Sequence, residues 1–380
     1  MKDLTSHPKI SVVMSVYNGE LFLEQSMESI LSQTYANFEL ILIDDCSTDN
    51  TIQILEHYAQ RDWRIRLFRN KENIGLTKSL NKGLELAKGE YVARQDADDI
   101  SLPERFETQV TFLDNHPEIG LVSCNMEIIN FEGHKTGEHK RACSSEFVSW
   151  YLLFYNRLAG HSQVTFRRQL ITKLGGYDEQ RRFSQDYELW SRVAKVSKIA
   201  ILSETLLKQR IHNSSVSTTR SSEQRSYSLS QSKHNIEELI SKEINLEEVV
   251  LLRNFWLSCW PLISSLEIRE SIYNLNSRLI DIYQSFTQQS SQRGDDVKAE
   301  LSQCLRILIG KQFLAWVQFP MKADHTLFPK LWISYYAFFW CPQGVPISWL
   351  ILLWRTLPKW LKLPVRKGYR ISRNLFKVKT

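Results

Sequence analysis

Two neighbouring aspartates, Asp44 and Asp45, directly follow an apolar and β-branched run at 38–43. Paired carboxylates at the end of a buried strand repel each other unless a ligand or a cation stabilises them. The polar residues that come next are typical of a helix N-cap, which accounts for Asp49. We interpret the aspartate pair as a site for a base, a ribose or a metal ion, with helix capping as the alternative.

A second acidic cluster places Asp96, Asp98 and Asp99 within four residues, after a strand-like run at 90–93. Mg²⁺ and Mn²⁺ bind one or two protein carboxylates and fill the rest of their shell with water and substrate phosphates. Such a cation would also help a nucleotide diphosphate to leave. The cluster therefore predicts a divalent-metal site, with a solvated acidic loop as the alternative.

Alternating short strands and helices must position these aspartates. We expect strands at 9–16, 38–43, 64–68, 90–93 and 120–124, because these runs are apolar and β-branched. Between them, apolar residues recur at helical spacing. The alternation predicts an α/β fold with a doubly wound, mostly parallel sheet flanked by helices, whose ligands bind beyond the carboxyl ends of the strands. Both acidic clusters are expected at those ends.

The following residues, 126–218, are less regular, and we expect loops there to carry His161, Asp186 and His212. Asp186 precedes an apolar helical pattern, so a helix N-cap is an alternative to a chemical role. Lys78 lies one turn into a predicted helix, where it could reach a phosphate or be an ordinary surface lysine.

Several short motifs follow one another over residues 8–218. In chain order they are Met14-Ser15-Val16-Tyr17-Asn18, Asp44-Asp45-x-Ser47-x-Asp49-x-Thr51, Asn73-x-Gly75-Leu76, Asp96-x-Asp98-Asp99 with Pro103 and Arg105, Gly160-His161, Gly175-Gly176-Tyr177-Asp178, Gln185-Asp186-x-x-Leu189-Trp190, and Arg210-x-His212-x-x-Ser215-x-Ser217. Each motif alone is modest, but the ordered set is specific. The set resembles family 2 glycosyltransferases of the bacterial surface-polysaccharide type, which have the GT-A fold.

The resemblance implies nucleotide-binding and metal-binding residues. Ser15 and Tyr17 would lie against the base or ribose, and Asp45 would accept a hydrogen bond from the base. Asp96 and Asp98 match the family's DxD-type motif, in which Asp98 would ligate Mn²⁺ or Mg²⁺ and Asp96 would serve nucleotide binding. His212 matches a histidine that approaches the metal or the diphosphate. Lys78 joins the predicted nucleotide-binding residues from its place in the predicted helix alone, as a phosphate contact.

The resemblance also implies the residues on the acceptor side. Asp186 matches the family's catalytic base, although many relatives have Glu-Asp where this chain has Gln185-Asp186. A carboxylate within hydrogen-bond reach of the acceptor hydroxyl is a suitable general base. One base, one metal and in-line displacement would give inversion at the anomeric carbon. His161 could line the acceptor pocket, with a structural histidine as the alternative.

The predicted activity is sugar transfer from a nucleotide diphosphate donor to a hydroxyl acceptor, such as a lipid-linked saccharide, in surface-polysaccharide or glycolipid assembly. A non-catalytic sugar-nucleotide-binding protein and a sugar-nucleotide pyrophosphorylase are the alternatives. The pyrophosphorylase would need a Gly-rich, basic first loop, where this chain has Tyr17-Asn18-Gly19-Glu20. No GxGxxG follows the first predicted strand, which argues against a dinucleotide-binding oxidoreductase.

Composition and charge narrow the class of protein further. The chain has 380 residues, of which 43% are hydrophobic and 24% charged, as in globular proteins. Its six cysteines include no CxxC pair, which argues against a thiolate zinc site and fits a reducing compartment. The net charge is +6, yet residues 325–380 carry ten Lys and Arg and no acidic residue. An anionic partner is therefore predicted for this tail.

The tail contains five tryptophans, and its uncharged run at 331–354 is interrupted by prolines. Each half is too short to span a bilayer, so we expect a peripheral contact with an anionic membrane surface, with packing on the catalytic core as the alternative. Nucleic acid is not expected as a partner, because no supporting motif accompanies the charge. With no secretory signal at the start, the predicted location is cytoplasmic, on the inner face of the membrane.

The predicted organisation has three parts. Residues 1–218 form the GT-A catalytic domain, divided into a nucleotide half (1–125) and an acceptor half (126–218). Residues 219–324 form a linker and a helical region, and the polar segment at 213–232, predicted to be a linker or an exposed loop, spans the boundary between this part and the catalytic domain. Residues 325–380 form the basic aromatic tail.

Overall fold

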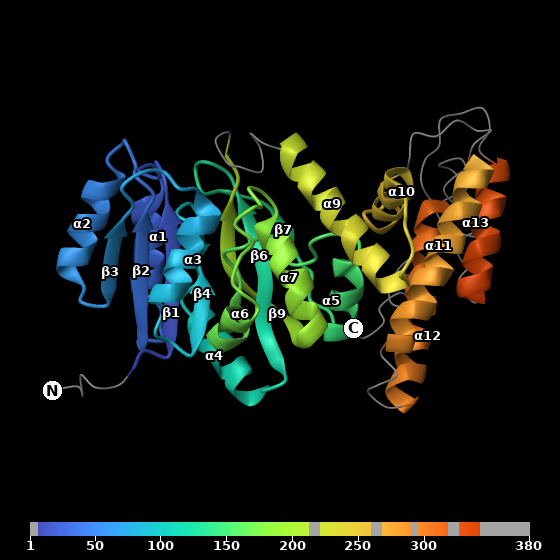
Figure 1. Cartoon of the computed structure of the whole chain (residues 1–380), viewed down its shortest axis with the longest axis horizontal. Helices are drawn as coiled ribbons and strands as arrows, with labels where there is room; N and C mark the ends of the chain where they lie inside the picture. Colours follow the sequence, from blue (N-terminus) through green and yellow to red (C-terminus); the bar gives the residue numbers. More distant parts are fainter. Residues whose placement is uncertain (1–6, 213–220, 260–267, 290–294, 318–326, 343–380) are drawn as a thin grey trace, which may run out of the picture. The chain divides into compact units, whose positions relative to one another are not determined.

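Figure 1 shows the computed structural model of the chain, which describes residues 7–212, 221–259, 268–289, 295–317 and 327–342. The chain divides into two compact units, Met1–Gln231 and Ser232–Thr380. The first unit contains every strand of the described residues, and the second unit is helical.

Nine strands of the first unit form a single sheet. They are β1 (Ile10–Val16), β2 (Phe38–Asp44), β3 (Ile65–Arg69), β4 (Tyr91–Arg94), β5 (Ile100–Ser101), β6 (Ile119–Ile129), β7 (Lys135–His139), β8 (Thr165–Arg167) and β9 (Lys198–Arg210). The strand order is β3-β2-β1-β4-β8-β6-β9-β5, with β7 paired to β6. Strands β1 to β4 pair in parallel, as does β6 with β9, while β5, β7 and β8 pair antiparallel.

Helices cover both faces of this sheet. They are α1 (Leu23–Leu31), α2 (Thr51–Arg61), α3 (Leu76–Leu86), α4 (Arg105–Asn115), α5 (Ser145–Leu152), α6 (Arg168–Lys173) and α7 (Gln185–Val196). Successive residues of β1 point to opposite faces. Val12 and Met14 pack with α1, α2 and α4, whereas Val13 packs with α3, α5 and α7. The predicted α/β fold with helices on both faces is confirmed (Figure 1).

Residues 126–218 are more regular than the sequence predicts. Strand β9 runs for 13 residues beside β6, and Asp186 lies in the first turn of α7 rather than in a loop. The expectation of loops is wrong here because β9 changes register with β6 at several points, which breaks its alternation of apolar and polar residues. His161 and His212 do lie outside helices and strands, as predicted.

Helix α9 (Ser221–Ile240) replaces part of the polar segment that we expected to be an exposed linker. Contacts within the first unit hold its beginning: the rings of Phe183 and Tyr227 are 5.9 Å apart, and the Ser184 hydroxyl donates to the Gln224 carbonyl at 3.3 Å. Tertiary contacts of this kind override a weak local helix preference. Residues 213–220 lie outside the described residues.

The second unit also contains α10 (Leu246–Trp256), α11 (Ile268–Gln289), α12 (Asp295–Val317) and α13 (Leu327–Trp340), as expected for a helical C-terminal region. Asn245 and Glu248 form a capping box at the start of α10. Phe255 packs against Phe313 and Trp316 of α12, with ring centroids 4.7 and 5.1 Å apart. All three rings are buried, so they form part of the hydrophobic core of this unit.

Helix α13 is the described part of the predicted basic aromatic tail. It contains Trp332 and Trp340, whereas Trp349, Trp354 and Trp360 lie outside the described residues, as do the basic residues beyond 342. Trp340 is buried and donates from Nε1 to Asn276 Oδ1 at 2.8 Å. Of the helices that the structure describes, none has the length and apolarity needed to cross a bilayer.

Candidate active site

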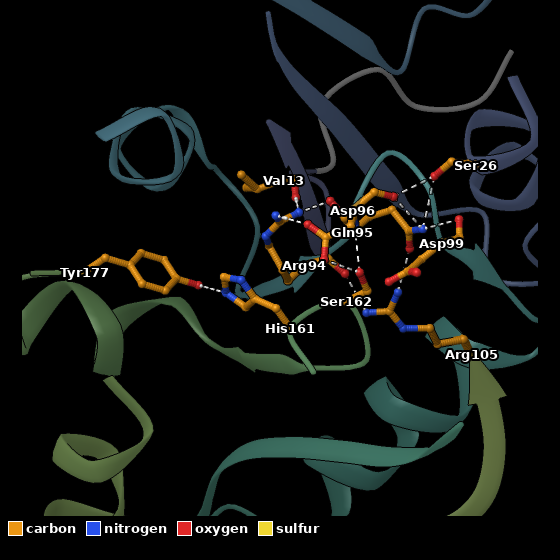
Figure 2. A network of polar contacts seen from close by, with 10 residues as sticks. All are labelled: Val13, Ser26, Arg94, Gln95, Asp96, Asp99, Arg105, His161, Ser162 and Tyr177. Carbon is orange, nitrogen blue, oxygen red and sulfur yellow. Dashed lines mark hydrogen bonds and ion pairs between the residues drawn. The ribbon is translucent and has the colours of Figure 1, made fainter. Parts of the chain in front are cut away.

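The loop after β4 begins with an ion pair between a buried arginine and a half-buried aspartate. The guanidinium of Arg94, the last residue of β4, contacts the Asp96 carboxylate (Figure 2). The Ser162 hydroxyl donates to Asp96 Oδ2 at 2.8 Å and accepts from the Asp96 backbone N–H at 2.9 Å. Burial acts to raise the pKa of Asp96, but the Arg94 charge, the nearby His161 and the hydrogen bonds from Ser162 and Arg94 together outweigh it and hold that pKa below its usual value. Asp96 is therefore a fixed anion with two side-chain partners.

Two buried polar residues, Gln95 and Arg105, form hydrogen bonds that hold this loop in place. Arg105 donates to the Arg94 carbonyl at 2.8 Å and to Gln95 Oε1 at 3.0 Å. Gln95 in turn donates to the Asp99 carbonyl at 2.9 Å (Figure 2). Burial lowers the pKa of Arg105 to about 10, so this residue stays charged at neutral pH. Together these bonds fix the course of the acidic loop.

The end of β9 brings further groups to the acidic loop. Asp98 Oδ2 and His212 Nε2 are 3.0 Å apart, and the Arg210 backbone N–H donates to Asp99 Oδ1 at 2.9 Å. Burial, followed by the charge of Asp96, raises the pKa of Asp98. Burial and the charges of its two neighbouring aspartates also raise the pKa of Asp99 well above its usual value. A cation would stabilise carboxylates that are crowded in this way.

Asp98 and His212 offer a carboxylate oxygen and an imidazole nitrogen at one point of the site. Within the residues described, no three His, Cys, Asp or Glu side chains come together in a way that could hold a metal. Two protein ligands are enough for Mg²⁺ or Mn²⁺ when water and substrate phosphates supply the others. The pair therefore fits a cation that binds together with a diphosphate.

Asp45, which follows β2, organises the loop before α3. Its Oδ1 accepts from Asn70 Nδ2 at 2.8 Å and from the Ile74 backbone N–H at 3.0 Å, while Oδ2 accepts from the Gly75 N–H at 2.8 Å. Gly75 has a φ of +86°, a conformation that glycine adopts without strain. Asp45 is thus a buried carboxylate that shapes this loop, and its contact with a base stays a prediction.

The other residues predicted to bind the donor are Ser15 and Tyr17, at the end of β1, and Lys78, in α3. Ser15 is half-buried on β1, and Tyr17 follows β1 with 51% of its surface exposed. Both lie with Asp45 at the carboxyl ends of the neighbouring strands β1 and β2, as expected. Lys78 is exposed in the first turn of α3. Their roles toward a nucleotide stay predictions.

Asp186 lies in the first turn of α7 but does not cap it, so the helix-capping alternative is wrong. The N-cap is Ser184, whose φ of +54° is strained for a residue other than glycine. Asn156, from the loop after α5, donates from Nδ2 to Asp186 Oδ2 at 2.8 Å. Burial raises the pKa of Asp186 to about 6, although hydrogen bonds from backbone N–H groups and from Asn156 oppose this shift. Such a carboxylate can take up a proton near neutral pH.

His161 is buried, and its Nε2 is 2.7 Å from the Tyr177 hydroxyl (Figure 2). Its ring also packs 5.9 Å from the Trp190 ring, centroid to centroid. Burial lowers the pKa of His161 to about 3, so the imidazole is neutral at pH 7. These contacts favour the structural alternative for His161, and its contact with an acceptor stays a prediction.

The structure also adds residues that the sequence interpretation did not single out. Arg94 ends β4 and Gln95 follows it, so two polar residues come directly between the apolar run and the acidic loop, which is a signal that could have been noticed. Asn156 carries no such signal, and Ser162 has only its place directly after the Gly160-His161 motif. Only the fold brings them to Asp96 and Asp186.

Comparisons with known proteins agree with this geometry. The family model "Glycosyl transferase family 2" matches residues 11–171. An uncharacterized glycosyltransferase of Haemophilus influenzae is 33% identical over 229 residues, which cover 57% of this chain and 70% of that protein. The chain belongs to glycosyltransferase family 2.

Two further similarities concern function and fold. The amylovoran biosynthesis glycosyltransferase AmsE of Erwinia amylovora is 32% identical over 214 residues, which cover 55% of this chain and 79% of AmsE. The S. aureus protein TarS, solved in complex with UDP-GlcNAc, aligns with a TM-score of 0.52 at 17% identity and covers 88% of this chain and 92% of its own. This family 2 glycosyltransferase therefore has the predicted GT-A fold, and it is an enzyme.

Proposed function

We propose that this glycosyltransferase moves a sugar from a nucleotide diphosphate donor to a hydroxyl acceptor, with inversion at the anomeric carbon. The observation that carries the proposal is Asp186, a half-buried carboxylate with a pKa of about 6 that is held by Asn156 and lies within electrostatic reach of Asp96. One base on the acceptor side and one acidic loop on the donor side are the groups that a single displacement requires.

In this proposal the donor binds at the carboxyl ends of β1, β2 and β4. Tyr17 and Ser15 contact the base or ribose, Asp45 accepts from the base, and Lys78 approaches a phosphate. Asp96 lies beside the nucleotide and holds the acidic loop in place through its bonds to Arg94 and Ser162.

Asp98 and His212 would hold Mn²⁺ or Mg²⁺ together with the diphosphate. When bound, such an ion neutralises the charge that develops on the leaving diphosphate. Asp98 and His212 keep their ligand atoms side by side, and Arg210 anchors the neighbouring Asp99 through its backbone N–H. The residues of this chain thus supply a prepared cation site at the donor diphosphate.

Asp186 removes the proton of the acceptor hydroxyl as that oxygen attacks the anomeric carbon. The bond from the anomeric carbon to the diphosphate oxygen breaks, and the nucleoside diphosphate leaves with the electron pair. Because attack and departure occur on opposite faces of one carbon, its configuration inverts. His161, close to Asp96 and Tyr177, would line the acceptor side as a neutral group.

We further propose a role in cell-surface polysaccharide or glycolipid assembly, on a hydroxyl acceptor such as a lipid-linked saccharide. The similarity to AmsE, a glycosyltransferase of amylovoran biosynthesis, supports this setting. The first compact unit would be the catalytic domain, and the second would attach it to the cytoplasmic face of the membrane as a peripheral protein.

Helix α13 supports the membrane proposal. Leu331, Tyr335, Phe338 and Phe339 are all exposed, and their spacing along α13 puts them on one face of the helix. Aromatic residues next to basic ones favour the headgroup level of a bilayer. The basic residues of the tail, which follow α13 in the sequence, would add electrostatic attraction to anionic lipids.

A donor screen tests the activity. Purified protein is incubated with UDP-, GDP- and dTDP-sugars and Mn²⁺, and release of the nucleoside diphosphate is measured. We expect turnover of at least one donor, its loss in EDTA and its return when Mn²⁺ is added in excess. Asp98→Asn should lower this turnover by at least about 100-fold, because it removes the charged ligand of the cation. The matched variant Asp281→Asn, in the second unit, should be as active as the original protein. Full turnover in EDTA would contradict the metal-dependent proposal.

Vesicle sedimentation tests the membrane contact. The full chain should bind phosphatidylglycerol vesicles more strongly than phosphatidylcholine vesicles, and salt should weaken the binding because charge attraction is screened. Replacing Tyr335, Phe338 and Phe339 together by serine should reduce binding several-fold, whereas Tyr273→Ser, at an exposed tyrosine of α11, should not. Equal binding by both variants would show that this face of α13 does not touch the membrane.

A further inference from the structure

The side chain of Asn156 has one orientation that satisfies its neighbours. Its Oδ1 accepts from the Leu158 backbone N–H at 3.2 Å, and its Nδ2 is 2.8 Å from Asp186 Oδ2. A backbone N–H can only donate, so the amide atom that faces it must be the oxygen. The amide nitrogen therefore faces Asp186, and Asn156 donates to the carboxylate.

A second contact fixes the distance between the two segments that carry this pair. The Tyr187 hydroxyl, next to Asp186 in α7, donates to the Leu152 carbonyl at the end of α5 at 2.9 Å. Asn156 follows α5 by four residues, so both partners of the Asn156–Asp186 bond belong to segments that are tied together independently of it. The bond thus joins two elements that are already held at a defined separation.

The groups that face Asp186 differ in sign and strength. Burial and, to a lesser extent, the Asp96 charge disfavour the ionised form of Asp186, and the buried Tyr177 hydroxyl lies close enough for the Asp186 charge to raise the pKa of Tyr177. The backbone N–H groups of Asp186 and Tyr187 and the Asn156 amide favour the ionised form. Among the described residues, Asn156 provides the side-chain donor in this set, and Oδ1 of Asp186 has no side-chain partner.

We infer that Asn156 is a positioning residue for the proposed base: its amide binds Asp186 Oδ2, stabilises the ionised carboxylate and leaves Oδ1 to receive the proton of the acceptor. This inference rests on the proposed function of Asp186. Asn156 does not touch the reacting atoms in this account, and it acts through the carboxylate that it orients.

The pH dependence of turnover tests this inference. Asn156→Ala removes the donor, and Asn156→Asp keeps the shape but replaces the amide by a second carboxylate. Both changes disfavour the ionised form of Asp186, so the acid limb of the kcat profile should move to higher pH, by about one unit for Ala and further for Asp. Turnover of Asn156→Asp should fall about tenfold or more at pH 6 and recover largely at pH 9.

Asn125 offers a matched control. Its Nδ2 donates to the Ser203 carbonyl at 2.7 Å and its Oδ1 accepts from the Arg141 backbone N–H at 2.8 Å, so it has the same pattern of bonds without a carboxylate partner. Asn125→Asp should leave the midpoint of the acid limb unchanged. A loss of turnover by Asn156→Asp that is equal at every pH would mean that Asn156 is merely structural, and would overturn the inference.

Two further measurements separate this inference from the proposed function. If Asp186→Asn abolishes turnover while both Asn156 variants keep the original acid limb, Asp186 stands as the base and the inference alone fails. If Asp186→Asn retains turnover, the proposed base itself is wrong. Titration of the Asp186 ¹³Cγ resonance by NMR needs no activity: its midpoint should rise in Asn156→Ala, and an unchanged midpoint would overturn the inference.

Discussion

The acidic loop after β4 and the first turn of α7 contain the same chemical group in two opposite environments. Asp96 is paired with the buried guanidinium of Arg94 and bonded by Ser162, and its pKa lies below the usual value. Asp186 is bonded by the neutral amide of Asn156, and its pKa rises to about 6. The difference shows how one site can keep one carboxylate permanently charged and prepare another to accept a proton.

Replacing the positively charged side chain of Arg94, beside the acidic loop, should have the largest effect on stability. In Arg94→Met the Asp96 carboxylate loses its buried partner, and we expect a loss of about 3 kcal/mol in the free energy of unfolding. Chemical denaturation followed by fluorescence measures this quantity. Lys140→Met, which breaks the exposed ion pair with Glu138, is the control and should cause no measurable loss. Equal stability of Arg94→Met and the original protein would contradict the claim that the Arg94 charge stabilises the Asp96 carboxylate.

The raised pKa of Asp186, in the first turn of α7, should make the stability of the folded chain depend on pH. The pKa of Asp186 is raised from 3.8 to about 6 in the folded chain, so stability is lost as the pH rises from about 4 to about 6. The amide side chain in Asp186→Asn cannot ionise, so this variant does not lose stability over that pH range. We expect this variant to be more stable than the original protein at pH 7, by roughly 1–2 kcal/mol, and equally stable near pH 4. Thermal melts at both pH values measure the difference, and a destabilised variant at pH 7 would contradict the account.

The first half of the catalytic unit could be predicted well from the sequence, because its strands and helices follow simple periods. The run at 38–43 corresponds to β2, and Asp44, Asp45 and the acidic loop at 96–99 do lie at strand ends. The second half could not, because the bulges of β9 disturb its alternation and α9 depends on contacts with Phe183 and Ser184. Local patterns predict elements only where tertiary contacts do not override them.

Part of the candidate site could be predicted from the sequence, and the residues that hold its carboxylates in place could not. The pairing of Asp98 with His212 joins residues 114 positions apart, and only the resemblance to a family linked them beforehand. Asn156 and Ser162 carry no chemical signal in sequence, since an isolated amide or hydroxyl in a loop is common. Their importance comes from the carboxylates that they contact, and those contacts exist only in the folded chain.

The central claim is that Asp186 accepts the proton while the acidic loop serves the donor. The most direct test measures turnover and donor affinity of Asp186→Asn and Asp96→Asn side by side, with a donor found in the screen. For Asp186→Asn we predict that kcat falls by roughly 10²–10⁴-fold while the Kd of the donor, from calorimetry, stays unchanged. Asp96→Asn should weaken donor binding. If Asp186→Asn turns over bound donor at the original rate, or loses donor affinity instead, Asp186 is not the base and the central claim is wrong.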